Sequence, residues 1–342
     1  MRPPHTKTPK HINITYKYKI VRRRKKDMKI IKTLIFIFAI LIFGCALKSK
    51  PVIGIAKIVS HPALDAVEKG IQDELNERKI DVVFDLQNAN GDINTAISIA
   101  KKFKEEKVKI AVGIATPTAQ ALVKELKNTV VVFSAVTDPV KAGLVNSLQK
   151  GEKYVTGISD MTPVKEQILL LTKIKPIKKL GLIYSSHEDN AVALANITRN
   201  VCKELGIELV EATVSSTAEV KQAALSIIKR VEAIYITTDN TVVAALSGIT
   251  EVALKNNVIV FSADPSSSKD ADVLGALGFD YYSMGRATGR LIIEILEGKK
   301  PEDIPTRFMT DPKDLELIIN TNVARKLNIK IPEDILSKAK II

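Results

Sequence analysis

The sequence predicts an α/β protein built as two doubly wound parallel-sheet lobes, with a hinge and an interlobe cleft between them. From residue 51 onward, short β-branched runs alternate with amphipathic helical periods, which is the pattern of strand–helix–strand units. One phrase occurs twice, as VVVFSAV at 130–136 and as VIVFSA at 258–263, and both copies lead into an Asp-Pro pair. The 342 residues are enough for two domains. The repetition therefore indicates two similar halves.

Each half is expected to contain four strands joined by helices. The helical segments repeat apolar residues every three or four positions, as in Leu64, Val67, Ile71 and Leu75, which gives each helix one apolar face. The strands are apolar almost throughout, as in a parallel sheet that helices cover on both sides. The duplicated phrase is the fourth strand of each half. We expect strands at 51–59, 81–87, 109–115 and 129–136, and again at 180–185, 207–214, 233–239 and 258–264.

Glycine- and proline-marked stretches are expected to carry the chain between the halves. The segment VTGISDMTP (155–163) is interpreted as such a passage, and 273–301 as a strand followed by a long helix. Lobes that exchange chain segments need several crossings of this kind. We therefore expect a leader at 1–44, lobe 1 at 51–158 and 283–310, and lobe 2 at 159–282 and 311–342.

The positive charge of the chain is concentrated at its N-terminus. The net charge is +13, but residues 1–44 hold 12 of the 51 Lys and Arg residues and only one of the 38 acidic residues. The rest of the chain is close to neutral. A nucleic-acid-binding protein would carry its basic excess on the folded domain, so nucleic acid is not an expected partner.

Residues 1–44 are expected to be a signal peptide. A basic stretch (21–32) precedes twelve apolar residues (33–44), which would form about 18 Å of helix, well short of a bilayer core of roughly 30 Å. This length fits the apolar region of a secretory signal. The end of the run, LIFGC, resembles a bacterial lipobox, so Cys45 would be lipidated and would anchor the chain to the membrane. Met28 is an alternative start.

Polar residues at the carboxyl ends of the strands are candidates for ligand binding, because open parallel sheets bind their ligands there. Hydroxyls beside free N–H groups at a helix start can receive a carboxylate, and Asp138 and Asp264 could neutralise an ammonium, so the set suits a zwitterion such as an amino acid. Structural roles also fit: Thr116 and Asn240 as helix N-caps, and Asp138 as a turn residue. The candidates are His61, Thr116, Thr118, Ser134, Thr137, Asp138, Asn240 and Asp264.

Motifs that carry catalysis or cofactor binding are missing from the sequence. There is no phosphate-binding G-x-x-x-x-G-K-[ST] loop, no G-x-G-x-x-G after a strand and no G-x-S-x-G nucleophile motif. His, Cys and Asp residues do not fall at metal-ligand spacing. Two of the four histidines lie in the leader, which leaves little capacity for general-base catalysis. We expect neither an enzyme nor a cofactor or metal site.

Seven motifs together carry a family resemblance: IVSHPALDAVEKGI (58–71), GIATPTAQAL (113–122), VFSAVTDPVKAGLV (132–145), VTGISD (155–160), ITTDNTVVAAL (236–246), VIVFSADPSS (258–267) and GALGFDYYSMGRATG (275–289). With them, the chain from residue 51 onward resembles the substrate-binding lipoproteins of ABC importers, which have the type I periplasmic-binding fold. More closely, it is similar to the branch that includes the tryptophan-binding lipoproteins.

The resemblance implies that a small solute is captured between the lobes and delivered to an ABC permease with a separate ATPase subunit. It also implies export and a lipid anchor on the cell membrane, with the protein facing the periplasm or the exterior. The first choice of solute is an aromatic amino acid such as tryptophan. By resemblance, the carboxylate falls to Thr116, Thr118, Ser134 and Thr137, and the ammonium to Asp264 and Asn240, with Asp138 as a further candidate.

Other functions on the same fold stay open. The chain could bind a nucleoside or a sugar instead, or it could be a periplasmic sensor that reports its ligand to a membrane receptor. A sugar-sensing transcriptional regulator would need an N-terminal helix-turn-helix, and residues 1–50 offer only a basic leader and an apolar run.

Overall fold

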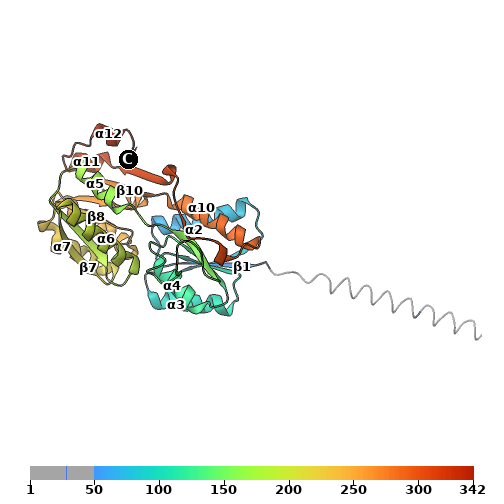
Figure 1. Ribbon diagram of the computed structural model, residues 1–342. Helices are drawn as coiled ribbons and strands as arrows, with labels where there is room; N and C mark the ends of the chain where they lie inside the picture. The colour runs from blue at the N-terminus through green and yellow to red at the C-terminus, as the bar shows by residue number, and fades with distance from the viewer. Residues whose placement is uncertain (1–27, 29–49) are drawn as a thin grey trace, which may run out of the picture. The chain divides into compact units, whose positions relative to one another are not determined.

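Two mostly parallel sheets, each packed between layers of helices, make up Pro51–Ile342 (Figure 1). The computed structural model describes Met28 and residues 50–342, so Cys45 and, apart from Met28, the predicted signal peptide lie outside the described residues. Within the described part, no helix is both long and apolar enough to cross a membrane. The predicted fold class, two α/β lobes with parallel sheets, is confirmed.

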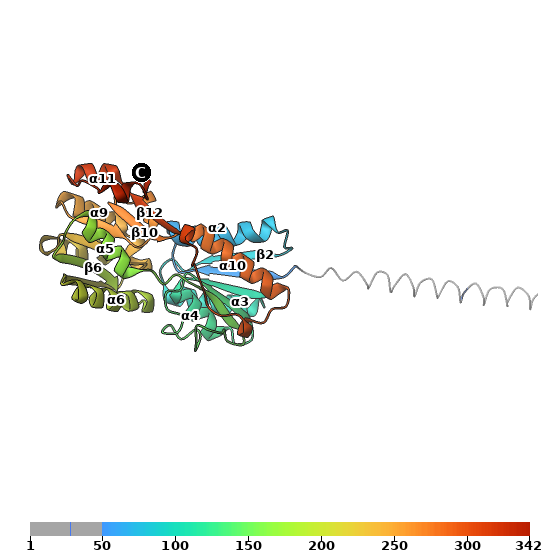
Figure 2. The ribbon, with the colours of Figure 1, turned by 45° about the horizontal axis from the view of Figure 1, so that its top comes forward.

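Lobe 1 is the six-stranded sheet with its helices. Helices α2 (Pro62–Glu77) and α10 (Tyr281–Leu296) cover one face, and α3 (Ile93–Glu105) and α4 (Thr116–Glu125) cover the other (Figure 2). All neighbouring strands run parallel. In spatial order they are β11 (Arg307–Phe308), β5 (Val155–Ser159), β4 (Val130–Ser134), β3 (Ile110–Ile114), β1 (Val52–Lys57) and β2 (Val83–Asn88).

Lobe 2 is the seven-stranded sheet with a core on each face. One core contains α5 (Val164–Ile174), α6 (Asp189–Leu205), α11 (Thr321–Lys326) and α12 (Glu333–Leu336), and the other contains α7 (Val220–Ile227), α8 (Asn240–Val243) and α9 (Leu246–Lys255). Only β12 and β10 pair antiparallel among the described strands. In spatial order the strands are β13 (Lys340–Ile341), β12 (Leu315–Ile319), β10 (Gly275–Phe279), β9 (Ile259–Ser262), β8 (Ala233–Ile236), β6 (Lys179–Ser185) and β7 (Glu208–Val214).

The first five strands of both lobes follow the same spatial order, 2-1-3-4-5. In lobe 1 this order is β2-β1-β3-β4-β5, and in lobe 2 it is β7-β6-β8-β9-β10. The repeated phrase of the sequence forms β4 and β9, the fourth strand of each series. Because all these strands are parallel within their sheet, their carboxyl ends share one edge, and the chain order reverses there beside β1 and beside β6.

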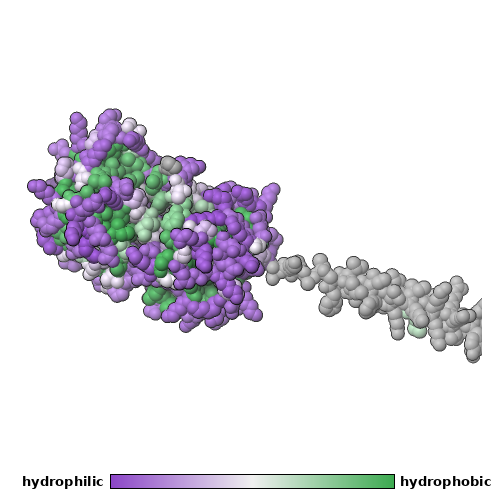
Figure 3. Space-filling view, viewed as in Figure 1, coloured by the Kyte–Doolittle hydropathy of each residue, from purple (hydrophilic) through white to green (hydrophobic). Residues whose placement is uncertain are grey.

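Aliphatic side chains fill three cores, one in lobe 1 and two in lobe 2. The face of the molecule in Figure 3 is hydrophilic over most of both lobes, with apolar side chains visible mainly on lobe 2. All three cores are built from residues after Pro51. We therefore expect residues 50–342 to fold on their own.

The segment 155–163 differs from its predicted role as a passage between the lobes. Its first part, Val155–Ser159, is the fully buried strand β5, and only the residues after it cross to lobe 2. Gly157 allows this, because a Cβ at that position would lie 2.0 Å from the carbonyl oxygen of Phe133 in the neighbouring strand. Glycine usually indicates a break in a strand, so the sequence does not reveal that β5 is one.

Helices α2 and α10 pack against each other with their backbones almost in contact. A Cβ on Gly285 would lie 2.2 Å from the carbonyl oxygen of Val67, and a Cβ on Gly70 would lie 2.3 Å from that of Tyr282. From Val67 against Gly285 to Glu74 against Gly289, the pairing advances along both helices in the same direction. The helices therefore run parallel, and both N-termini lie at the same end of lobe 1.

A buried carboxylate reinforces this helix pair. The side chain of Glu74 on α2 is only 1% exposed and forms ion pairs with three arginines. Arg78 comes from α2 itself, at 3.0 Å, while Arg286 and Arg290 come from α10, at 2.7 and 3.4 Å. A buried carboxylate that stays charged is costly unless it is paired, as Glu74 is here.

We expect Gly285→Ala to destabilise the protein by about 1–3 kcal/mol, because the added methyl group must push α2 and α10 apart. Urea unfolding followed by circular dichroism measures the effect. The matched control is Gly248→Ala in α9, where the nearest atom, Cβ of Lys221, lies at 3.3 Å and is thus farther away than the carbonyl oxygen of Val67 is at Gly285. If both substitutions change the free energy of unfolding equally, close α2–α10 packing is not a determinant of stability.

Candidate ligand-binding site

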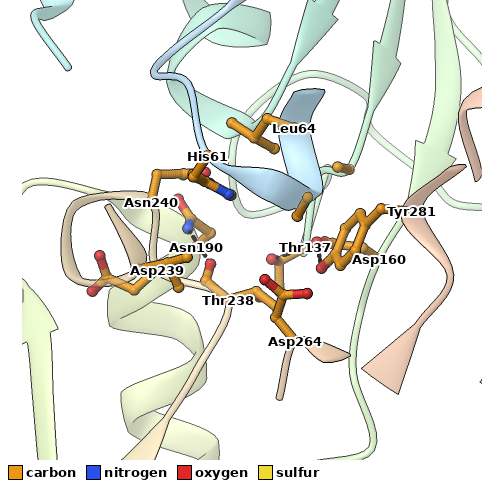
Figure 4. Close-up of a pocket in the computed structure, with 13 residues that line it drawn as sticks. His61, Leu64, Thr137, Asp160, Asn190, Thr238, Asp239, Asn240, Asp264 and Tyr281 are labelled. Atoms are coloured by element: carbon orange, nitrogen blue, oxygen red, sulfur yellow. Dashed lines mark hydrogen bonds between the residues drawn. The ribbon is translucent and has the colours of Figure 1, made fainter. Parts of the chain in front are cut away.

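A small cavity of about 20 Å³ lies between the lobes, where the carboxyl ends of the two sheets face each other (Figure 4). Its polar side chains all follow the end of a strand, either in the loop or in the first turn of the next helix. This is the location expected of a ligand site in open α/β sheets. The polar lining residues are His61, Thr137, Asp160, Asn190, Thr238, Asp239, Asn240, Asp264 and Tyr281.

Four of the predicted ligand-binding residues meet at this cavity. His61 and Thr137 come from lobe 1, following β1 and β4, and Asn240 and Asp264 come from lobe 2, following β8 and β9. The structure therefore brings residues that are distant in the sequence to one place. Their roles toward a ligand stay predictions.

Two predicted residues, Thr118 and Ser134, have hydroxyls already engaged within lobe 1 and do not line the cavity. Thr118 donates to the carbonyl oxygens of Ile114 and Ala115, one turn back in the chain. Ser134 Oγ and Thr288 Oγ1 of α10 hydrogen-bond at 2.7 Å. Each hydroxyl ties a strand end to a helix in this structure.

Asp138 and Thr116 also lie outside the cavity lining. Asp138 accepts a hydrogen bond from the backbone N–H of Lys141 at 3.0 Å, as a turn residue does. Thr116 differs, because its buried hydroxyl has no hydrogen-bond partner among the described residues. Ligand binding by Thr116 stays a prediction, and its hydroxyl, unlike the carboxylate of Asp138, is not engaged by another described residue.

Five of the polar lining residues, Asp160, Asn190, Thr238, Asp239 and Tyr281, are absent from the predicted set. Asp160 is missed because the strand before it, β5, is not predicted. Thr238 and Asp239 directly precede Asn240, so the carboxyl-end rule that finds Asn240 also covers them. Asn190 and Tyr281 lie in the first turn of a helix, where the sequence does not distinguish them from ordinary helical residues.

Several buried polar atoms at the cavity have no hydrogen-bond partner among the described residues. They are both ring nitrogens of His61, Oδ1 of Asn190, Oγ1 of Thr238 and Oδ2 of Asp264. Buried polar atoms are normally paired, and leaving one unpaired costs about 1–3 kcal/mol. The grouping of such atoms around one cavity indicates a site that hydrogen-bonds a polar ligand.

Asp160 forms the centre of a buried network beside the cavity. Its two carboxylate oxygens accept hydrogen bonds at 3.1 Å, one from Thr137 Oγ1 and one from the Tyr281 hydroxyl. The pKa of Asp160 is raised to about 6, mainly by burial and in smaller part by the charge of the nearby Asp264, while these hydrogen bonds oppose the rise. Burial likewise raises the pKa of Tyr281. The network joins lobe 1 to two segments that cross between the lobes.

Asp239 and Glu188 hold the opposite side of the cavity. Asp239 accepts hydrogen bonds from the N–H groups of Ser185 and Val242, at 2.6 and 3.0 Å, and burial raises its pKa to about 8, with the charge of Glu188 adding to the effect. Glu188 accepts hydrogen bonds from the N–H and hydroxyl of Thr241, and another from the Asn240 amide. The side chain of Asn240 is thereby fixed at the cavity wall.

The charges around the cavity favour a positive group. Asp160 and Asp264 line it, and no Lys or Arg is among the described lining residues. The third acidic lining residue, Asp239, turns its carboxyl toward the N–H groups of Ser185 and Val242 instead (Figure 4). Burial lowers the pKa of His61, which keeps its ring neutral near pH 7. An ammonium would be stabilised here by carboxylates that are otherwise poorly solvated.

The N-terminus of α2 offers a receptor for a carboxylate on the same cavity. Ala63 and Leu64 line the cavity at the start of this 16-residue helix, and the first helical hydrogen bond is donated only by Asp65. Among the described residues, no side chain caps this end. The N–H groups of the first turn and the helix dipole both favour an anion. The cavity thus has a cation side and an anion side.

Comparison with known proteins identifies a family match and one well-matched curated relative. Residues 52–342 match the family described as ABC transporter substrate binding protein. The tyrosine-binding protein of Clostridioides difficile (strain R20291) is 34% identical over 288 residues, which cover 83% of this chain and 82% of that protein.

Two solved structures differ in how well they superpose. An ABC domain from Streptococcus pneumonia in complex with L-Trp has 31% identity, covers 86% of this chain and 100% of that one, and gives a TM-score of 0.82. The ligand-free, open structure of a substrate-binding protein from Clostridium difficile has 29% identity, covers 85% and 99%, and gives 0.65. The identities are nearly equal, and this chain superposes better on the L-Trp complex than on the ligand-free, open structure.

We expect the free energy of unfolding to fall as the pH rises from about 4 to about 6, and Asp160→Asn to remove part of this fall. In that range the folded state keeps a proton on Asp160, whereas an unfolded aspartate has lost it. The folded state then binds more protons, so stability declines with rising pH, by on the order of 3 kcal/mol for a pKa difference of this size.

Urea unfolding of both proteins at about pH 4, 5.5 and 7 measures the difference. The control is Asp272→Asn, since Asp272 is exposed and pairs only loosely with Lys326, at 3.3 Å. An Asp160→Asn protein that keeps the full decline of the wild type would show that Asp160 is not the titrating group.

Proposed function

The chain belongs to the family of ABC transporter substrate-binding proteins, and on this basis we propose that it captures an aromatic amino acid between its lobes and delivers it to an ABC permease. Proteins of this family are extracytoplasmic and bind solutes. The resemblance inferred from the seven sequence motifs is thereby confirmed at the level of the family. The proposed partners are the permease, which has its own ATPase subunit, and the solute.

The observation that supports the proposal is that the cavity has acidic oxygens in its lining and free N–H groups at the start of α2. The unpaired Oδ2 of Asp264 and Oδ1 of Asn190, which belong to the lining of the same cavity, would accept hydrogen bonds from the ammonium of an amino acid. The first-turn N–H groups of α2 would bind the carboxylate. A zwitterion satisfies both sides, whereas a neutral sugar leaves the carboxylates without a counter-charge.

The aromatic class is supported by the relatives and by the apolar part of the lining. A tyrosine-binding protein and an L-Trp complex are among the similar proteins. Ala63, Leu64, Ala135 and Val243 give the cavity an apolar wall. Sites for small molecules have volumes of about 300 Å³ or more, so the lobes must move apart to make room for the solute.

We further propose that the chain is exported by the signal at 1–44 and anchored through a lipid on Cys45. This arrangement would keep the binding lobes close to the permease on the outer side of the membrane. The proposal rests on the basic and apolar runs of the leader and on the LIFGC motif.

Calorimetric titration of residues 50–342 with L-tyrosine, L-tryptophan and L-phenylalanine tests the proposed function, with a nucleoside and a sugar as comparisons. We expect saturable binding of at least one aromatic amino acid, and a rise in melting temperature at high ligand concentration. Binding of the nucleoside or the sugar alone would contradict the proposed solute.

Asp264→Asn should weaken binding of the amino acid at least about 30-fold, because removing one partner of a buried charge pair costs about 2–5 kcal/mol. The fold should persist, since an asparagine keeps an oxygen for the hydrogen bonds that Ser266 donates to Oδ1 at 2.6 and 2.8 Å. The control Asp272→Asn removes an exposed charge from the same lobe. Equal affinity of Asp264→Asn and wild type would refute the role of Asp264.

A further inference from the structure

Gln120 and Asp189 connect the two lobes outside the cavity. Gln120 lies on α4 of lobe 1, and its Nε2 donates to Oδ2 of Asp189, on α6 of lobe 2, at 2.6 Å. Neither residue lines the cavity. Elsewhere, α2 of lobe 1 contacts η3 (Pro265–Lys269) of lobe 2. The lobes therefore meet in more than one place, and between α4 and α6 the hydrogen bond of Gln120 to Asp189 joins them.

The side chain of Gln120 is held in place by its own lobe. The second hydrogen on Nε2 is donated to the carbonyl oxygen of Ala142, in the loop after β4, at 3.1 Å. Both donors of the amide are thereby used, one within lobe 1 and one toward lobe 2. An anchored side chain loses less conformational freedom when it forms the second bond, so the interlobe bond is favoured when the lobes approach.

Asp189 is the middle of three consecutive residues with different tasks. Glu188 before it is buried and fixes the start of α8 through Thr241, and Asn190 after it is buried and lines the cavity. Asp189 itself is exposed and bonds to the opposite lobe. A shift of this short segment therefore moves a cavity residue and the interlobe contact together.

We propose that Gln120 and Asp189 form a closure latch, which holds the lobes together over the cavity and sets the rate at which a bound solute leaves. This inference rests on the proposed function for the identity of the solute, but not for the existence of the latch. The latch stabilises only the closed arrangement, because the two side chains separate when the lobes do. It therefore shifts the open–closed equilibrium without touching the ligand.

The effect of a Gln120 substitution on the dissociation rate should depend on the charge that it introduces. Gln120→Ala and Asp189→Ala should each raise it about three- to tenfold, as expected for one lost hydrogen bond, and the double variant should do no more than either alone. Gln120→Glu places a like charge against Asp189 and should raise the rate further. Gln120→Lys can pair with Asp189 and should keep the rate at or below that of the wild type.

Stopped-flow dissociation of L-tyrosine and L-tryptophan from residues 50–342 measures these rates. The matched control is Gln72→Ala, a helical glutamine of lobe 1 whose side chain, in the part of the chain that the structure describes, bonds within α2, to the carbonyl oxygen of Glu68 at 3.4 Å. Gln72→Ala should leave the rate unchanged. A purely structural role of Gln120 would not reverse sign between its glutamate and lysine variants.

Small-angle X-ray scattering without ligand provides a second readout that does not depend on the solute. A compact chain of this length has a radius of gyration of about 19 Å. We expect Gln120→Glu to have a larger radius than Gln120→Lys. If the wild type binds neither amino acid, the proposed function fails and scattering alone decides on the latch. Equal radii, together with equal dissociation rates where binding is seen, would overturn the latch.

Discussion

The near-contact of the α2 and α10 backbones is the constraint on which the rest of lobe 1 depends. Three glycines and the buried Glu74 hold the helices parallel, so both N-termini end at the cavity. The N-terminus of α2 carries His61 and Leu64, and the N-terminus of α10 carries Tyr281. A larger side chain in place of one of these glycines would move His61, Leu64 and Tyr281 relative to each other. The shape of the binding site is thereby decided some distance away from it, by residues that never meet the solute.

Buried acidic groups give the cavity its chemical character and link it to closure. Asp160, Asp239 and Asp264 are all buried and all line the cavity, although the carboxyl of Asp239 points away from the other two (Figure 4). Carboxylates in this position are costly when charged unless a cation or donors satisfy them. A bound ammonium would meet them only when the lobes are together, and this difference between open and closed states is what lets a ligand drive closure.

The architecture could be predicted from the sequence because parallel strands and amphipathic helices have different periods, and the repeated phrase shows that the pattern occurs twice. Two strands, β5 and β12, are exceptions. Strand β5 contains a glycine and is followed by a proline-containing turn, and β12 pairs antiparallel with β10 through contacts that no local pattern reveals.

The binding site was less accessible to sequence reasoning, because position at a strand end does not decide where a side chain points. Ser134 ends its strand but faces Thr288 of α10, and Thr118 bonds back to the end of the strand before its helix. Thr137 and Asp264 lie in the loops just after equivalent strands and do reach the cavity. Only the direction of each side chain and the packing of helices distant in the sequence separate these cases.

The distance along the chain between α2 and α10 has a consequence for synthesis and transport. Arg290 and Glu74, which pair in the helix contact, are 216 residues apart, so lobe 1 lacks one wall of its core until almost the whole polypeptide has emerged from the ribosome. A nascent lobe 1 would therefore stay incomplete during most of translation. A chain that must pass through a membrane pore as an extended thread would be helped by such late completion, because the first half cannot lock into its final form ahead of the second.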